Sequence, residues 1–197
     1  MNNNPQSTTH ESPTLKKPKS SFIVDLIEII AASLAAIILI MTFCLRVCTV
    51  DGHSMDKTLS HGEVLLISSI GYTPKENDII VFQDLSLGKA VVKRIISTGD
   101  KWVKIDYDNA IVYVSSDNTF TEDEIINESA YLYLDIGSYK QSGELIRYVP
   151  KGSLFVMGDN RNNSSDSRGA IGLVNENLVL GKVILRISPS DKIGTVK

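Results

Sequence analysis

The chain has 197 residues, of which 43% are hydrophobic and 22% charged, proportions typical of a folded domain with its own core. A formal net charge of −3 gives no reason to expect nucleic acid or another polyanion as a partner. Both cysteines, Cys44 and Cys48, lie within or beside one apolar segment, which excludes a disulfide scaffold and a cysteine-based metal site.

The N-terminal part divides into a polar tail, residues 1–21, and an apolar segment, residues 22–48. No charged residue occurs from Ile29 to Leu45, which as a helix spans roughly 25 Å, and apolar flanks lengthen that reach. This predicts a single transmembrane anchor. Lysines 16, 17 and 19 favour a cytoplasmic tail, so residues 49–197 are expected outside the cytoplasmic membrane.

Three other interpretations of the apolar segment fit less well. A cleaved secretory signal would be shorter and would end in a small-x-small pair, which is missing here. A lipoprotein site at Cys48 would require small residues where Arg46 and Val47 stand. A buried soluble helix remains open because Asp25 and Glu28 shorten the strictly apolar window. A retained anchor is favoured.

Residues 49–197 are predicted to be mainly β, as an antiparallel barrel or sandwich, because short β-branched runs alternate with turn residues. Thr121–Ala130 reads as a short acidic helix or a solvated insertion, the latter being favoured. The predicted strands are Glu63–Ile70, Asp78–Phe82, Ala90–Ile96, Trp102–Ile105, Ala110–Val114, Tyr131–Leu134, Leu154–Met157 and Lys182–Ile187.

Ser54 lies in an irregular stretch between the anchor and the first of these predicted strands. A serine hydroxyl is a poor nucleophile until a base takes its proton. Serine is common in loops, so Ser54 alone is weak evidence for catalysis and needs a partner.

Lys93 is the candidate base. Side chains alternate along a strand, so Lys93 shares its face with Val91 and Ile95, while Arg94 points to the opposite face and needs a carboxylate. Apolar surroundings lower the pKa of an ammonium towards the range in which the neutral amine accepts a proton. A solvated strand lysine is the structural alternative.

A third polar cluster, Met157–Arg168, follows the predicted strand Leu154–Met157. Asn, Asp and Ser often fold loops by bonding to the local backbone, so a structural turn would explain it. Two arginines and two aspartates interleaved with serines also suit a paired, rigid support around a site.

Together these segments resemble bacterial type I signal peptidases over roughly Val50–Lys197, although Tyr107–Tyr148 aligns only vaguely. The order of the motifs and the N-terminal anchor agree as well. The matching motifs are Gly52-x-Ser54-Met55-x-x-Thr58-Leu59, Asp78-Ile79-Ile80-Val81-Phe82, Val92-Lys93-Arg94-Ile95-Ile96 with Gly99-Asp100, and Gly158-Asp159-Asn160-Arg161-x-Asn163-Ser164-x-Asp166-Ser167-Arg168.

The chain departs from the family pattern at three places. Lys57 stands where the family usually has proline, and Ser97-Thr98 replaces a longer link before Gly99. Gly52 stands where some members carry a serine that helps to bind the oxyanion, so the backbone N–H of Ser54 would carry more of that role.

The resemblance implies a serine endopeptidase that removes signal peptides from secreted preproteins at the outer face of the membrane. Ser54 would be the nucleophile and Lys93 the general base, with Ser164 holding the Lys93 amine. Ionic support would come from Asp159, Arg94, Asp166 and Arg168. Small P1 and P3 side chains of an extended substrate would bind in shallow pockets, at a site that includes Gly52 and Met55. Membrane lipid is the other expected partner. No cofactor or metal is expected, because metal-ligand spacing is lacking.

Three rival functions were weighed. A Ser–His hydrolase would use His53 or His61, but His53 is adjacent to Ser54, and adjacent side chains in extended backbone diverge. A self-cleaving Ser–Lys regulator would have an N-terminal DNA-binding helix pair in place of an anchor. A membrane-tethered β domain that binds surface partners without catalysis is separated from the enzyme by activity on a signal-peptide substrate.

Overall fold

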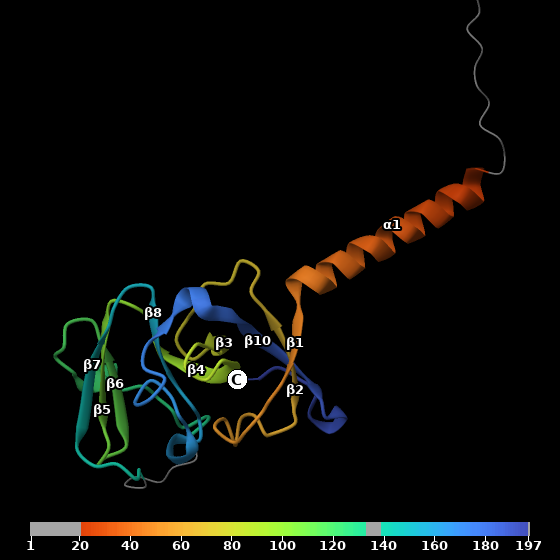
Figure 1. The fold of residues 1–197 in the computed structure, drawn as a ribbon. Coiled ribbons are helices and arrows are strands. Elements are labelled where there is room, and N and C mark those ends of the chain that lie inside the picture. The colour runs from red at the N-terminus through yellow and green to blue at the C-terminus, as the bar shows by residue number, and fades with distance from the viewer. Residues whose placement is uncertain (1–20, 133–138, 197) are drawn as a thin grey trace, which may run out of the picture. The chain divides into compact units, whose positions relative to one another are not determined.

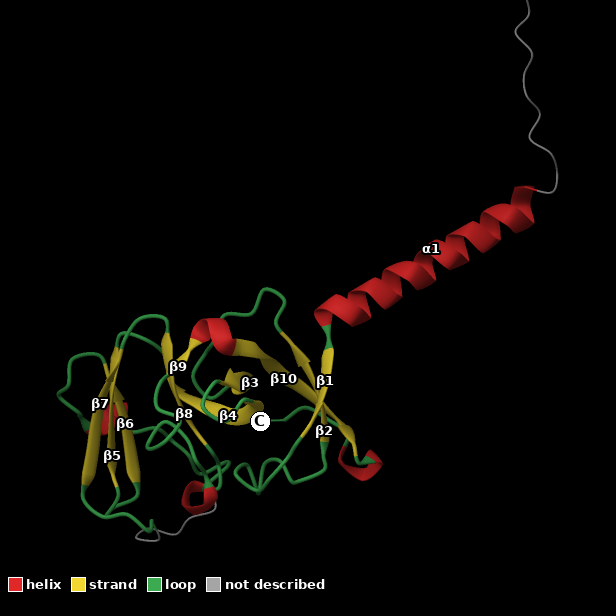
Figure 2. Ribbon diagram, in the orientation of Figure 1, coloured by secondary structure: helices red, strands yellow, loops and turns green. Residues whose placement is uncertain are grey.

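The computed structural model describes residues 21–132 and 139–196 (Figure 1). The chain divides into two compact units, Met1–Ile40 and Met41–Lys197. The first contains most of helix α1 (Ser21–Cys44), and the second contains the strands (Figure 2).

Helix α1 is apolar on all sides. From Phe22 to Ile40 it is long and apolar enough to cross a membrane, and its side chains are exposed in the isolated protein. The hydroxyl of Ser33 donates to the Ile29 carbonyl at 2.7 Å, so this polar group is satisfied within the helix. A helix of this character suits lipid better than water. The helix ends at Cys44, before the predicted boundary at residue 48, because the next residues form a strand.

The larger sheet holds seven of the described strands, in the order β1-β2-β10-β3-β4-β8-β9, and neighbouring strands are antiparallel. The central strand β3 is apolar almost throughout because it has a core on each face. Ile79 and Val81 pack on one side, and Ile80 and Phe82 on the other. The strands are β1 (Arg46–Thr49), β2 (Val64–Ser68), β3 (Ile79–Asp84), β4 (Lys89–Ser97), β8 (Ser153–Met157), β9 (Val174–Asn175) and β10 (Val179–Ser188).

The smaller sheet has the order β6-β5-β7, again antiparallel, and is formed by β5 (Lys101–Asp106), β6 (Ile111–Ser115) and β7 (Glu144–Val149). Its buried side chains share a cluster with Ile96 of β4 and Phe155 of β8, which joins the two sheets. Short 3-10 helices occupy Glu122–Glu124, Arg161–Asn163, Glu176–Leu178 and Ser190–Lys192.

The prediction of a mainly antiparallel β protein with one apolar N-terminal helix is confirmed. In the described residues the strands form open sheets and not a closed barrel. Seven of the eight predicted strands correspond to observed ones. The eighth, Tyr131–Leu134, is wrong at Tyr131, which lies in a turn, and its last two residues lie outside the described ranges.

Three observed strands were missed. Strand β1 follows α1 so closely that its apolar residues read as more of the anchor. In β7 the exposed face carries Ile146 and Tyr148, which obscures the alternation that identifies a strand. Strand β9 has two residues, too few for any pattern.

Candidate active site

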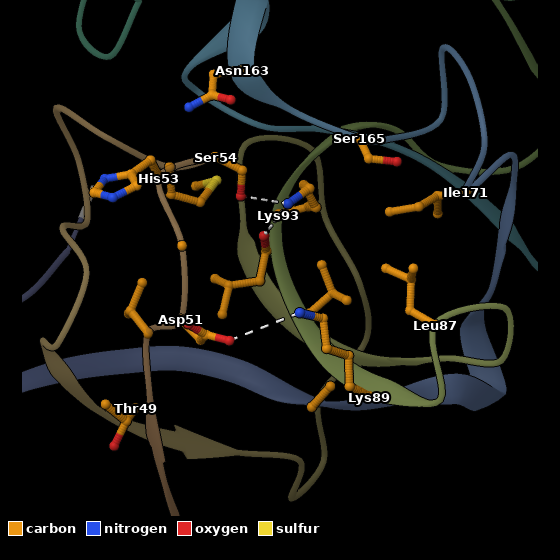
Figure 3. A pocket seen from close by; sticks show the side chains of 16 residues that line it. Thr49, Asp51, His53, Ser54, Leu87, Lys89, Lys93, Asn163, Ser165 and Ile171 are labelled. Carbon is orange, nitrogen blue, oxygen red and sulfur yellow. Dashed lines mark hydrogen bonds and ion pairs between the residues drawn. The ribbon is translucent and has the colours of Figure 1, made fainter.

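Ser54 lies in the loop between β1 and β2, and Lys93 lies on β4. The Nζ of Lys93 donates a hydrogen bond to the Oγ of Ser54 at 2.6 Å and another to the Val92 carbonyl at 3.0 Å (Figure 3). Both residues were predicted from the sequence, and the fold brings them together across 39 positions of the chain.

The surroundings of Lys93 are apolar, as alternation along β4 predicted. Its side chain is 2% exposed, and its cross-strand partner is Ile80. Val91 and Ile95 lie on the same face and belong to one apolar cluster with Ile80. Burial lowers the pKa of Lys93 to about 8, because an ammonium loses hydration there, although the charges of Asp166 and Asp159 act in the opposite direction.

Arg94, the next residue, points to the other face of β4 and meets Asp159. Its Nε and Nη2 donate to the two carboxylate oxygens at 2.9 and 2.7 Å, and both side chains are buried. Thr58 donates its hydroxyl to Asp159 at 2.5 Å, which ties the Ser54 loop to the same carboxylate. The ring of Tyr131 lies 3.8 Å from the Arg94 guanidinium carbon.

Asp166 forms the second ionic centre with Arg168. Arg168 donates through Nε and Nη2 to the two oxygens of Asp166, at 2.8 and 2.9 Å. Burial raises the pKa of Asp166, but the hydrogen bond and charge of Arg168 outweigh burial and hold the pKa below its ordinary value. Each of the four residues expected to give ionic support is therefore in an ion pair, Asp159 with Arg94 and Asp166 with Arg168.

Ser164 lies beside the Ser54 loop. Its hydroxyl donates to Asp166 at 2.7 Å, a bond the sequence did not indicate, so a bond from Ser164 to Lys93 stays a prediction. Gly158 separates Ser164 from Ser54, and a Cβ at Gly158 would overlap both the Ser164 hydroxyl and the Ser54 carbonyl. The close approach of these two segments therefore requires glycine.

Two residues of the polar cluster Met157–Arg168, Asn160 and Arg161, make further contacts that were not predicted from the sequence. Asn160 holds the Ser54 loop, donating its backbone N–H to the Ser54 carbonyl and its side-chain amide to the His53 carbonyl, each at 3.0 Å. Arg161 is fully buried and pairs with Glu128 and the Tyr139 hydroxyl.

Glu128 corrects the prediction for Thr121–Ala130. The segment begins with an exposed 3-10 helix, but Glu128 itself is buried against Arg161 and is not solvated. No local pattern marks this burial, because it depends on an arginine 33 residues away.

A groove of about 290 Å³ lies beside Ser54 and Lys93. The Ser54 loop forms one wall, which includes Gly52 and Met55. Strand β4, Leu87 and Ile171 contribute apolar side chains (Figure 3). Met55 is also part of the core. Gly52 has φ +103°, a conformation that side chains disfavour, and its N–H donates to His61 Nδ1 at 3.1 Å.

The histidines near Ser54 have other partners. His53 Nδ1 lies 3.0 Å from Asp56, and His61 accepts from Gly52. These contacts give no support to a Ser–His pair. In residues 21–132 and 139–196, no group of three or more His, Cys, Asp or Glu side chains is arranged to hold a metal ion.

The departure at Lys57 has a conformational counterpart. Lys57 has φ +83°, whereas the proline ring fixes φ near −65°. This backbone therefore excludes the proline that the family usually carries there. The Nζ of Lys57 donates to the Leu132 carbonyl at 2.6 Å.

Residues 23–188 match a family model described as signal peptidase, peptidase S26. Signal peptidase I P of Bacillus subtilis subsp. natto is 32% identical over 193 residues, covering 92% of this chain and 98% of that protein. Signal peptidase IB of Staphylococcus aureus strain COL is 30% identical over 187 residues, covering 85% and 90%. A signal peptidase I structure from Enterococcus faecalis V583 shares 27% identity and covers 56% of this chain and 97% of its own, with a TM-score of 0.41.

Proposed function

The chain belongs to the signal peptidase family, peptidase S26, and we propose that it cleaves signal peptides from secreted preproteins with Ser54 as nucleophile and Lys93 as general base. The observation that carries the proposal is the 2.6 Å contact between Lys93 Nζ and Ser54 Oγ. Because burial lowers the pKa of Lys93 to about 8, a useful fraction of the amine is neutral near physiological pH.

In this mechanism the neutral Lys93 takes the hydroxyl proton of Ser54 while Oγ attacks the scissile carbonyl carbon. The C–N bond of the tetrahedral intermediate breaks, and Lys93 passes its proton to the leaving amine, which leaves an acyl-enzyme. Lys93 then takes a proton from water, whose oxygen attacks the ester. Release of the acid returns that proton to Ser54.

The backbone N–H of Ser54 is the proposed donor to the developing oxyanion. The N–H of Gly52 is engaged by His61, so it holds the loop in place instead of stabilising charge on the substrate. Asp159, Arg94, Asp166 and Arg168 are proposed to hold the two loops around the dyad, and Ser164 to orient Lys93 once substrate is bound.

The groove beside the dyad is proposed to bind the signal-peptide side of the substrate as an extended strand. Its apolar walls and small volume, about 290 Å³, suit small side chains at P1 and P3. Residues 1–21 would be a cytoplasmic tail, the apolar helix that ends at Cys44 the anchor in membrane lipid, and the β sheets from β1 onward a catalytic domain outside. The shared bilayer would raise the effective concentration of substrate.

Two substitutions test the dyad. We expect Ser54→Ala and Lys93→Ala each to abolish cleavage of a peptide with Ala at P1 and P3, assayed in detergent, while circular dichroism stays unchanged. Ser129→Ala and Lys104→Ala, both away from the groove, serve as matched controls and should cleave normally. Wild-type rates in either dyad variant would rule out the proposed Ser54–Lys93 dyad, whereas no cleavage by the wild type would leave a non-catalytic binding domain as the better interpretation.

The orientation is tested separately, with protease added to intact spheroplasts. Degradation of the β domain with survival of an N-terminal tag is expected from the lysines at 16, 17 and 19. Protection of the β domain would overturn the orientation but not the dyad.

A further inference from the structure

One edge of β4 is open beside the groove. Strand β3 pairs with β4 from Lys89 to Arg94, whereas β8 pairs with it only from Arg94 onward. Within the described residues, the backbone of Lys89–Lys93 therefore has no strand partner on its second edge. An extended peptide is able to pair with such an edge, running along the strand as it leaves Ser54.

A charged pair spans the groove further along this edge. The Nζ of Lys89 on β4 lies 3.8 Å from Asp51 of the opposite wall, and both line the groove (Figure 3). Lys89 is four positions from Lys93, so a peptide extended from Ser54 reaches the pair within roughly 13 Å, or about four residues. The side chains are 58% and 78% exposed, and the contact is too long for a strong hydrogen bond, so the pair is weak.

Asp84 offers the Lys89 ammonium a second partner. The two residues are directly opposite in the β3–β4 register and share a face of the sheet. Asp84 is 5% exposed. One carboxylate oxygen, Oδ1, accepts from the backbone and hydroxyl of Ser86 and from the Leu87 N–H, while the buried Oδ2 has no hydrogen-bond partner.

The charge state of Asp84 suits a partner for the Lys89 ammonium. Burial raises the pKa of Asp84, but the bonds from Ser86 and Leu87 outweigh burial and hold the pKa below its ordinary value. The buried Asp84 carboxylate is therefore ionised, and its Oδ2 has no hydrogen-bond partner. Lys89 lies directly across the strand pair, but its ammonium is at Asp51. Lys93, on the same face, is already bonded to Ser54.

We propose that Lys89 is a specificity-determining residue, whose ammonium alternates between Asp51 and Asp84 and so decides how many substrate residues upstream of the cleaved bond the groove accepts. With Lys89 on Asp51 the groove is closed after about four residues. With Lys89 on Asp84 a longer peptide continues along β4. This inference rests on the proposed binding of substrate in the groove.

The test compares two synthetic peptides with Ala at P1 and P3, one beginning at P3 and one extending to P8. Asp84→Asn keeps the Oδ1 acceptor but removes the charge that receives Lys89. We expect the ratio of KM for the long peptide to KM for the short one to rise about fourfold, the size of an exposed ion pair. Asp117→Asn is the matched control, because Asp117 accepts the same kind of turn bonds just after β6 of the smaller sheet. It should leave the ratio unchanged.

Lys89→Met provides a second measurement on an exposed residue, where folding is not at risk. It removes the closed state, so the same KM ratio should fall about threefold, and Asp84→Asn should have no further effect on the ratio in that background. An unchanged ratio in Lys89→Met, or an equal effect of Asp84→Asn with and without Lys89, would overturn the proposal. If the wild type cleaves neither peptide, the proposed function fails and this inference fails with it.

Discussion

The two faces of strand β4 give a buried basic side chain opposite kinds of neighbour. Lys93 and Arg94 are consecutive, and each is 2% exposed. On one face Lys93 meets Ile80, Val91 and Ile95, and its pKa falls to about 8. On the other face, Arg94 donates hydrogen bonds to both oxygens of the buried Asp159 carboxylate. Equal burial therefore does not give two basic side chains the same electrostatic environment. The neighbours decide whether the cation is held by a carboxylate, as Arg94 is, or has a lowered pKa, as Lys93 has.

The largest expected effect on cleavage comes from replacing Lys93 by the residue type of its neighbour Arg94. Lys93→Arg places a guanidinium, which stays protonated, where a neutral amine is needed, so cleavage should fall by at least about 10³-fold. Lys101→Arg on β5, a residue paired with Glu76, is the control and should retain full activity. Substantial cleavage by Lys93→Arg would show that Lys93 is not the base.

The reverse change removes the cation from the ionic face. Arg94→Met leaves Asp159 buried and short of its charge partner, which should cost about 3–5 kcal/mol of unfolding free energy in urea titrations. Lys182→Met breaks the more exposed pair with Asp78 and should cost less than about 1 kcal/mol. Equal losses in the two variants would mean that the Arg94 pair is no more important than a surface contact.

The lowered pKa of Lys93 also predicts how stability depends on pH. Between about 8 and the ordinary value of 10.5, Lys93 is neutral in the folded chain and protonated in the unfolded one, so unfolding takes up a proton. Stability should rise with pH across that window, by on the order of 3 kcal/mol in all. The difference in unfolding free energy between the wild type and Lys93→Met isolates this contribution. A flat difference would contradict the lowered pKa.

The same titration should govern the rate. Below a pH of about 8 the neutral fraction of Lys93 in the free protein changes about tenfold per pH unit, so kcat/KM should rise with that slope and level off above it. A profile without this limb, together with loss of cleavage in His53→Ala, would instead favour a Ser–His enzyme.

The smallest effect concerns the hydroxyl on the ionic face. Thr58→Val keeps the shape of the side chain but removes one of the donors to Asp159, while Arg94 still occupies both oxygens. A loss of about 1 kcal/mol in unfolding free energy is expected. Thr119→Val, which removes a comparable bond to Asp117 at an exposed turn, should lose less.

The contrast between the faces of β4 was accessible from the sequence because it depends on alternation alone. Lys93 among β-branched neighbours and Arg94 in need of a carboxylate both follow from a period of two. The order of the motifs likewise identified Ser54 and the polar cluster Met157–Arg168 as candidate site residues. Burial of Glu128 was not accessible, since nothing near it in sequence differs from a solvated acidic segment. The bond of Ser164 was missed for another reason, because Asp166 and Lys93 are both plausible partners for one rotatable hydroxyl.

The loop that carries Ser54 is held by residues that lie far along the chain. Thr58 bonds to Asp159 across 101 positions, His53 to Asn160 across 107, and the Thr58 carbonyl to Arg186 across 128. Contacts this distant form late, because a long loop must close before any of them contributes stability. During synthesis Ser54 therefore precedes these distant groups that fix its loop in place. Until the C-terminal third has folded, Ser54 lies in a loop without those contacts, so the proposed active site is assembled only when the chain is nearly complete.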